Sequence, residues 1–254
     1  MNTISLLPKG KPIFPECELA LQEPNGLLAA GGMLNVEWLI EAYTKGIFPW
    51  FSAGEQIKWW SPDPRAVLCI NSLHLSTKTK QFIKKNEFKL TINYAFDEVI
   101  TSCARKKNKK EEIWITDEMI IAYKALHSKN YAHSFEVWKA GELIGGLYGV
   151  AIGNIFSGES MFSNKTEASK IALLFTCAQI YKMGFKWLDC QVMNDHLSSM
   201  GAISITRNDF KKNLIDYKST QDNNINPEKF ETFWPNTKKL FEYYISKKKN
   251  QHHP

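Results

Sequence analysis

The apolar positions of the chain follow two patterns, and the change between them falls near residue 65. The first part is interrupted by proline and glycine, and its clearest periodic segment is 35–46, N-V-E-W-L-I-E-A-Y-T-K-G. The apolar residues of this segment recur at the spacing of an amphipathic helix; they are Trp38, Leu39, Ala42 and Tyr43. Asn35 is a suitable N-cap and Gly46 a suitable stop, so we predict one short helix here.

From Val67 onward, short apolar runs alternate with amphipathic stretches. The runs predict strands at 66–70, 88–93, 132–139, 141–152, 154–162 and 185–192, and the amphipathic stretches predict helices at 76–85, 96–105, 116–127 and 164–183. This order predicts an α/β (α+β) fold in which a mixed sheet carries helices on its faces. We therefore expect a small N-terminal domain over 1–65 and a larger domain over 66–254.

Length and composition limit the class of protein. The chain has 254 residues, 44% of them apolar, which is enough for a sizeable core. No run approaches the roughly 18 apolar residues of a membrane helix, and the start, M-N-T-I-S-L-L-P-K-G, lacks the features of a signal peptide. We therefore expect a cytoplasmic protein without membrane association. The five cysteines include no C-x-x-C pair, which predicts reduced thiols and no metal site.

The net charge of +6 is unevenly distributed. Basic residues gather in three places, at 78–85, 105–110 and 247–249. Such clusters can contact nucleic-acid phosphates and release their counterions. Solvated loops and a frayed tail give the same pattern, so the charge distribution leaves both interpretations open.

One carboxylate interrupts an apolar hairpin rich in glycine. The segment 145–163 reads G-G-L-Y-G-V-A-I-G-N-I-F-S-G-E-S-M-F-S, and Glu159 lies within it. A carboxylate in such surroundings is unfavourable unless it has partners or a task. The later strand W-L-D-C-Q-V places Asp189 and Gln191 two residues apart, which puts their side chains on one face. If the two strands are neighbours, the three polar groups converge in an apolar cleft and form the candidate catalytic centre.

Three other kinds of active site can be tested against the residues of this region: a serine nucleophile, a coenzyme A site and a glycosidase carboxylate pair. Ser160 would need a glycine in place of Phe162 to form a nucleophile elbow. An acyl-CoA transferase would hold pyrophosphate at a glycine-rich turn, but the segment S-N-K-T-E-A-S-K at 163–170 has no glycine. Glu159 and Asp189 could also be a glycosidase pair or a structural ion pair, and the spacing alone leaves these possibilities open.

Two further features of the sequence concern aromatic residues and a histidine. Tryptophan and proline are concentrated over 47–65, where the rings can stack on bases or fill the side of the core. His196, in N-D-H-L-S-S-M-G, is typical of a residue that orients a loop or caps the following helix.

Long ordered strings of this chain closely resemble leucyl/phenylalanyl-tRNA–protein transferases, from about residue 10 to residue 210. The matching strings are E-P-N-G-L-L-A-A-G-G (23–32), A-Y-T-K-G-I-F-P-W-F (42–51), W-W-S-P-D-P-R-A-V-L (59–68), H-S-F-E-V-W (133–138), G-G-L-Y-G-V-A-I-G (145–153), F-S-G-E-S-M-F-S (156–163), A-S-K-I-A-L-L (168–174) and D-C-Q-V-M-N-D-H-L-S-S-M-G-A (189–202). The last forty residues carry little of this resemblance.

The resemblance implies a reaction, a fold and partners. Enzymes of this family transfer Leu or Phe, and Met less well, from aminoacyl-tRNA to proteins that begin with Arg or Lys, which creates an N-degron for the bacterial N-end rule. The implied fold is a small N-terminal domain packed on a domain like the GNAT acetyltransferases. The resemblance implies no cofactor and no metal, and we expect a monomer. A FemX-like or acetyl-type N-acyltransferase on the same fold, or a non-catalytic tRNA- or degron-binding protein, is the alternative.

The resemblance also implies roles for particular residues. Gln191 would align the attacking amine, Asp189 would hold Gln191 and stabilise positive charge, and Glu159 would orient the amine or the ester. The aminoacyl pocket would be lined or bordered by Leu147, Phe156, Met161, Leu173 and Leu188. The terminal adenosine of the tRNA would lie near Trp50 and Trp114.

Overall fold

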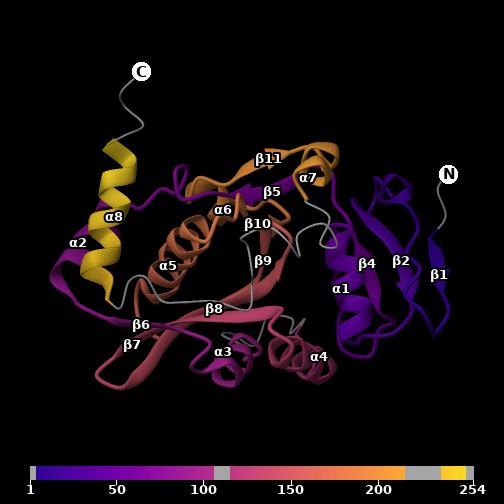
Figure 1. The fold of residues 1–254 in the computed structure, drawn as a ribbon, viewed down its shortest axis with the longest axis horizontal. Helices are drawn as coiled ribbons and strands as arrows, with labels where there is room; N and C mark the ends of the chain where they lie inside the picture. Colours follow the sequence, from indigo (N-terminus) through magenta and orange to yellow (C-terminus); the bar gives the residue numbers. More distant parts are fainter. Residues whose placement is uncertain (1–3, 106–114, 215–235, 250–254) are drawn as a thin grey trace.

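The computed structural model describes residues 4–105, 115–214 and 236–249, which form two sheets with helices packed on them (Figure 1). The mixed α/β class predicted from the sequence is confirmed. The closer likeness to acetyltransferase domains stays a prediction. Within the described ranges, none of the helices has the length and apolar character needed to cross a membrane.

The N-terminal segment forms a four-stranded sheet in the order β1-β2-β4-β3. Its strands are β1 (Ser5–Leu7), β2 (Leu27–Gly31), β3 (Phe48–Pro49) and β4 (Lys58–Trp60), with a short 3-10 helix at Cys17–Leu19. The predicted helix is α1 (Val36–Thr44), and the Asn35 side chain accepts a hydrogen bond from the Trp38 N–H at 3.0 Å, as expected for an N-cap. The four apolar residues predicted for its inner face are all buried.

The rest of the chain builds a seven-stranded sheet in the order β11-β5-β10-β9-β8-β7-β6. Its strands are β5 (Arg65–Leu68), β6 (Lys89–Ile92), β7 (Ala132–Lys139), β8 (Glu142–Ile152), β9 (Ile155–Ser163), β10 (Trp187–Gln191) and β11 (Ile203–Ile205). Strands β9 and β10 run parallel, and the other neighbouring pairs are antiparallel. The predicted neighbourhood of the strands that carry Glu159 and Asp189 is therefore confirmed.

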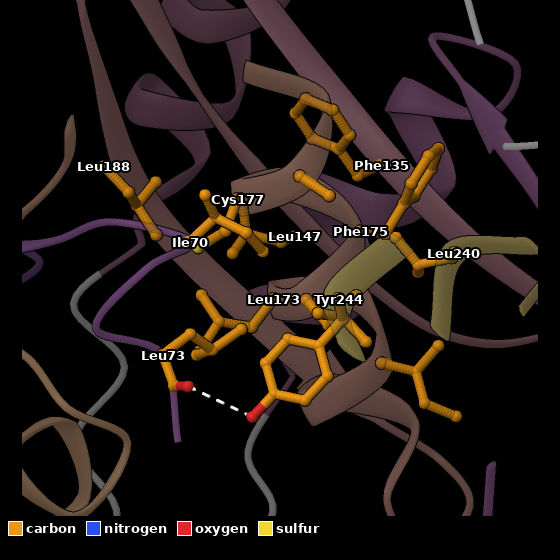
Figure 2. Close-up of a cluster of buried hydrophobic side chains, with 14 of the residues drawn as sticks. Ile70, Leu73, Phe135, Leu147, Leu173, Phe175, Cys177, Leu188, Leu240 and Tyr244 are labelled. Carbon is orange, nitrogen blue, oxygen red and sulfur yellow. Dashed lines mark hydrogen bonds between the residues drawn. The ribbon is translucent and has the colours of Figure 1, made fainter. Parts of the chain in front are cut away.

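Helices cover both faces of this sheet. They are α2 (Thr77–Lys85), α3 (Phe96–Cys103), α4 (Asp117–Ser128), α5 (Ala168–Lys182), α6 (Asp195–Ser199), α7 (Arg207–Asn213) and α8 (Thr237–Lys249). Alternate residues of β8 point to opposite sides: Leu147 packs in the core around α5, whereas Tyr148 packs in the core with α3 and α4. Figure 2 shows the first core, in which the Tyr244 hydroxyl of α8 donates a hydrogen bond to the Leu73 carbonyl at 3.2 Å.

The second core joins the two parts of the chain. Trp38 and Trp59 of the N-terminal segment belong to the same buried cluster as Phe96, Tyr123 and Tyr148. Trp38 and Trp59 are therefore core residues, whereas Trp50 remains 43% exposed. Strand β4 ends at Trp60 and β5 begins at Arg65, but because the core is shared, the domain boundary at 65/66 stays a prediction.

Candidate active site

A mainly apolar pocket of about 370 Å³ opens between the N-terminal segment and the large sheet. Phe48, Pro49 and Trp50 form the wall that the N-terminal segment contributes. The opposite walls come from β8, β9, β10, α5 and α6. The pocket therefore exists only because the two parts of the chain are packed together.

A β-bulge places Glu159 at this pocket. In the pairing of β8 with β9, Tyr148 faces Ser160 and Gly149 faces Gly158, so Glu159 is the extra residue between them. A bulge leaves one residue outside the ladder and redirects its side chain. Glu159 thus lines the pocket together with its neighbours Gly158 and Ser160.

The Glu159 carboxylate lies at the end of a chain of buried hydroxyl groups. Tyr123 donates a hydrogen bond to Glu159 Oε2 at 3.0 Å, and the Tyr123 hydroxyl lies 2.6 Å from that of Tyr43. Burial is the main cause that raises the Glu159 pKa to about 7, and the negative charge of Asp189 adds to it, against the lowering effect of the hydrogen bonds from the two tyrosines. A carboxyl group with this pKa can hold or release a proton near neutral pH.

Asp189 belongs to a buried ion pair. Arg65 donates from Nε to Asp189 Oδ1 at 2.8 Å and from Nη2 to Oδ2 at 2.7 Å, and both side chains are almost fully buried. The guanidinium group lies between the rings of Phe48 and Phe210, 4.8 and 4.6 Å from their centroids. Ser157 also donates to Asp189 Oδ2 at 3.1 Å. The pair therefore fastens β5 to β10 and both to the N-terminal segment.

Gln191 corrects one expectation from the sequence. Asp189 and Gln191 do not face a common cleft, because Gln191 lines the pocket and Asp189 lies behind it. The pairing of β10 with β5 contains a bulge between these residues, and Gln191 has a left-handed backbone with φ of 58°. Asp189 still holds Gln191, since its Oδ1 accepts the Gln191 backbone N–H at 3.0 Å.

The Gln191 side chain connects to Glu159. Its Nε2 donates to the Gly158 carbonyl at 3.0 Å and to Glu159 Oε1 at 3.3 Å. The structure therefore brings all three predicted catalytic residues into one hydrogen-bonded network. Their catalytic roles stay predictions.

The residues predicted for the aminoacyl pocket divide into two groups. Four of them line the pocket: Leu147, Met161, Leu173 and Leu188. Phe156 does not line it, because it is fully buried and packs edge-on against Phe135 and Phe185. Trp50 lines the pocket, whereas Trp114 lies outside the described residues. His196 also lines the pocket from within α6, and the cap of that helix is Asn194, not His196.

Three residues that support the site were not predicted to do so from the sequence: Arg65, Tyr43 and Tyr123. Arg65 is a cation at the start of the apolar strand R-A-V-L. If this strand is buried, the cation needs a buried anion as its partner, which is a signal that the sequence does contain. Nothing in the spacing of Tyr43 and Tyr123, 80 residues apart, indicated that their hydroxyls meet.

Comparisons with known proteins agree with this architecture. Residues 67–215 match the family model described as leucyl/phenylalanyl-tRNA protein transferase, and residues 32–63 match the model of its N-terminal domain. Similar curated proteins named leucyl/phenylalanyl-tRNA--protein transferase occur in Shewanella. The protein of Shewanella baltica strain OS155 is 51% identical over 210 residues, covering 83% of this chain and 89% of its own. That of Shewanella sp. strain ANA-3 is 48% identical over 227 residues, covering 89% and 95%.

The mixed sheet, its N-terminal partner and these matches define the class of protein, which is an aminoacyltransferase. The family model covers more than half of the chain. The chain belongs to the leucyl/phenylalanyl-tRNA protein transferase family.

Proposed function

We propose that the protein transfers Leu or Phe, and Met less well, from aminoacyl-tRNA to the N-terminal Arg or Lys of acceptor proteins. The product would be an N-degron for the bacterial N-end rule, and the enzyme would act as a monomer in the cytoplasm without a cofactor. The observation that carries this proposal is the apolar pocket with the hydrogen-bonded pair of Glu159 and Gln191 at its wall.

The pocket suits a bulky apolar aminoacyl group. Four of its apolar side chains, Leu147, Met161, Leu173 and Leu188, come from β8, β9, α5 and β10 and form an uncharged wall. One methylene group changes selectivity in such a pocket by only about 1–3 kcal/mol. Use of several apolar amino acids is therefore expected, and the ester end of the donor would lie beside Gln191.

The chemistry required at the polar wall is modest. The α-amine of the acceptor has an ordinary pKa of about 7.7–8.0, so a useful fraction is neutral at pH 7–8. The amine attacks the ester carbonyl and forms the C–N bond. When the tetrahedral intermediate collapses, the ester C–O bond breaks, and the ribose oxygen leaves as a hydroxyl with the proton that the amine gives up. Glu159 would orient the amine and accept its proton, because burial has already raised the pKa of this carboxyl to about 7. The Gln191 amide can both donate and accept hydrogen bonds beside the reacting atoms.

Asp189 would act as a positioning residue. Its carboxylate is occupied by two hydrogen bonds from Arg65, one from Ser157 and one from the Gln191 N–H. These bonds fix the left-handed backbone that turns Gln191 toward the pocket. A rigid supporting group of this kind increases the reaction rate by keeping the reactants in the right orientation.

A transfer assay tests the proposed function. The full-length protein is mixed with Phe-tRNA labelled in the amino acid and a peptide that begins with Arg, and we expect label in the peptide. A peptide that begins with Ala is the control and should stay unlabelled. Folded protein that transfers no label from intact Phe-tRNA would overturn this proposal. A melting temperature raised by coenzyme A but not by tRNA would favour the acetyl-type alternative.

Replacing Trp50 by alanine is expected to raise KM for Phe-tRNA between about fivefold and a hundredfold. The exposed ring lines the pocket mouth, and stacking on a base contributes about 1–3 kcal/mol. Steady-state kinetics measure the change, and Trp50→Phe, which keeps an aromatic face, should recover most of the affinity. An equal rise of KM in both variants would show that stacking on the Trp50 ring does not contribute to donor binding.

Glu159 predicts an unusual pH dependence of stability. Its pKa is about 7 in the folded protein and near 4.5 in the unfolded chain. Between these values the folded state binds more protons, so the contribution of Glu159 to stability is greatest below about pH 4.5 and is lost as the pH rises to 7. We expect Glu159→Gln to raise the free energy of unfolding relative to wild type at pH 8, by about 1–3 kcal/mol, but much less at pH 5.

Urea unfolding of both proteins at the two pH values measures this difference, and the same variant should transfer Phe slowly. An equal shift at pH 5 and pH 8 would contradict the raised pKa.

A further inference from the structure

Helix α8 lies outside the residues that the family model matches, which end at 215. It is nevertheless part of the folded protein. Leu240, Phe241 and Tyr244 are buried in the core around α5, as Figure 2 shows for Leu240 and Tyr244. The helix packs beside α2 at the end of the molecule away from the N-terminal sheet (Figure 1).

The two helices concentrate the positive charge of the chain. Their sequences, T-K-T-K-Q-F-I-K-K and T-K-K-L-F-E-Y-Y-I-S-K-K-K, contain nine lysines and one glutamate. The whole chain has a net charge of +6, so the remainder is slightly acidic. A charge excess held by two adjacent helices is an electrostatic footprint for a polyanion.

Neighbouring acids offset the charge of these lysines only in part. Lys78 lies near enough to Glu167 to help lower the pKa of that carboxyl, but among the described side chains the ion pairs form elsewhere, and none involves a lysine of α2 or a lysine of α8 up to Lys248. Burial lowers the pKa of Lys248, and the positive charge of Lys80 lowers it further. Lysines from the two helices thus repel one another, and an anion bound between them would relieve this repulsion.

A groove of about 750 Å³ separates the two helices. Lys84 and Lys85 of α2 and Lys238 of α8 line it, together with the carboxylates of Glu87 and Glu242. The carboxylates disfavour an anion on their side of the groove. Phosphates are therefore expected along the exposed lysines of the two helices, which are Lys78, Lys84, Lys85, Lys238 and Lys239.

The position of this surface relative to the pocket is set by α5. Leu173 lines the pocket, and Tyr181 of the same helix lies under the Lys247 ammonium, 4.8 Å from its ring centroid. Eight residues of α-helix span about 12 Å. A polyanion whose end occupies the pocket can therefore also reach the lysines of α8.

We infer that α8 and α2 together form a binding surface for the sugar–phosphate backbone of the RNA whose aminoacylated end enters the pocket, an inference that rests on the proposed function. The contacts are electrostatic and carry no base specificity. Helix α8 extends this surface beyond the part of the chain covered by the family model.

The test replaces three lysines of α8 in the full-length protein, as Lys238→Gln, Lys239→Gln and Lys247→Gln together. Binding of Phe-tRNA is measured between 50 and 300 mM salt. We expect about tenfold weaker binding at 100 mM salt and a plot of log affinity against log salt that is less steep by about 2–3, because each phosphate contact contributes about 1. The matching triple replacement by arginine should keep wild-type affinity.

Two controls separate this inference from the proposed function. Lys9, Lys11 and Lys129 are exposed lysines of other regions, and their replacement by glutamine should leave both quantities unchanged. Transfer from phenylalanyl-adenosine, which has no phosphate backbone, should be equally fast in wild type and in the α8 variant. If wild type transfers Phe from tRNA but the α8 variant binds tRNA with unchanged affinity and salt dependence, the surface does not bind RNA, and an acidic protein becomes the occupant to examine.

Discussion

Replacing Asp189 by asparagine is expected to lower the free energy of unfolding by about 3–5 kcal/mol, because it leaves the Arg65 guanidinium buried without its counter-charge. Arg65 and Asp189 are 2% and 0% exposed and are joined by two hydrogen bonds. Water cannot solvate the arginine left behind. Urea denaturation at pH 7 measures the loss directly.

A second variant distinguishes the ion pair from simple packing. Arg65→Met with Asp189→Leu removes both charges and keeps apolar volume, so it should be destabilised by less than the sum of the two single replacements. Additive losses would mean that the two side chains stabilise the fold independently. The double variant should also transfer Phe slowly, because Gln191 loses the acceptor for its backbone N–H.

Replacing Gln191 by alanine is expected to lower kcat for transfer by about a hundredfold to a thousandfold, the effect of losing one preorganised donor at a reacting centre. The affinity for Phe-tRNA should change little, because the apolar walls of the pocket remain. Single-turnover kinetics with saturating donor separate the chemical step from binding.

Val192 provides the matched control for Gln191. It is the next residue, lines the same pocket and is 42% exposed. Val192→Ala should keep kcat within about threefold of wild type, since it removes no hydrogen bond near the ester. A normal rate in Gln191→Ala would remove this amide from the mechanism.

Much of the architecture could be predicted from local patterns. The helix at 35–46, with Asn35 as its cap, and the strand meander from 132 to 163 follow from apolar spacing and turn residues, and the structure confirms both. The shared core could not be predicted in this way. Trp59 shares one buried cluster with residues of α3 and α4. This cluster joins segments that are distant in sequence, which periodicity does not encode.

The site could be predicted only in part, and the reason lies in two irregular strands. A regular strand would place Asp189 and Gln191 on one face, but the bulge and the left-handed backbone at Gln191 turn its amide toward the pocket. The bulge at Glu159 likewise depends on the partner strand. The residue types identified the three polar groups, but the directions in which their side chains point depend on how the strands pair.

The hydrogen-bonded hydroxyls of Tyr43 and Tyr123 and the contact of Arg65 with Phe48 connect the N-terminal segment to the rest of the chain. The protein should consequently melt in a single cooperative transition, with no intermediate in which only one part has unravelled. Since Phe48, Pro49 and Trp50 are also a wall of the pocket, a fragment starting at residue 66 would present a bare apolar face and half of a donor cleft.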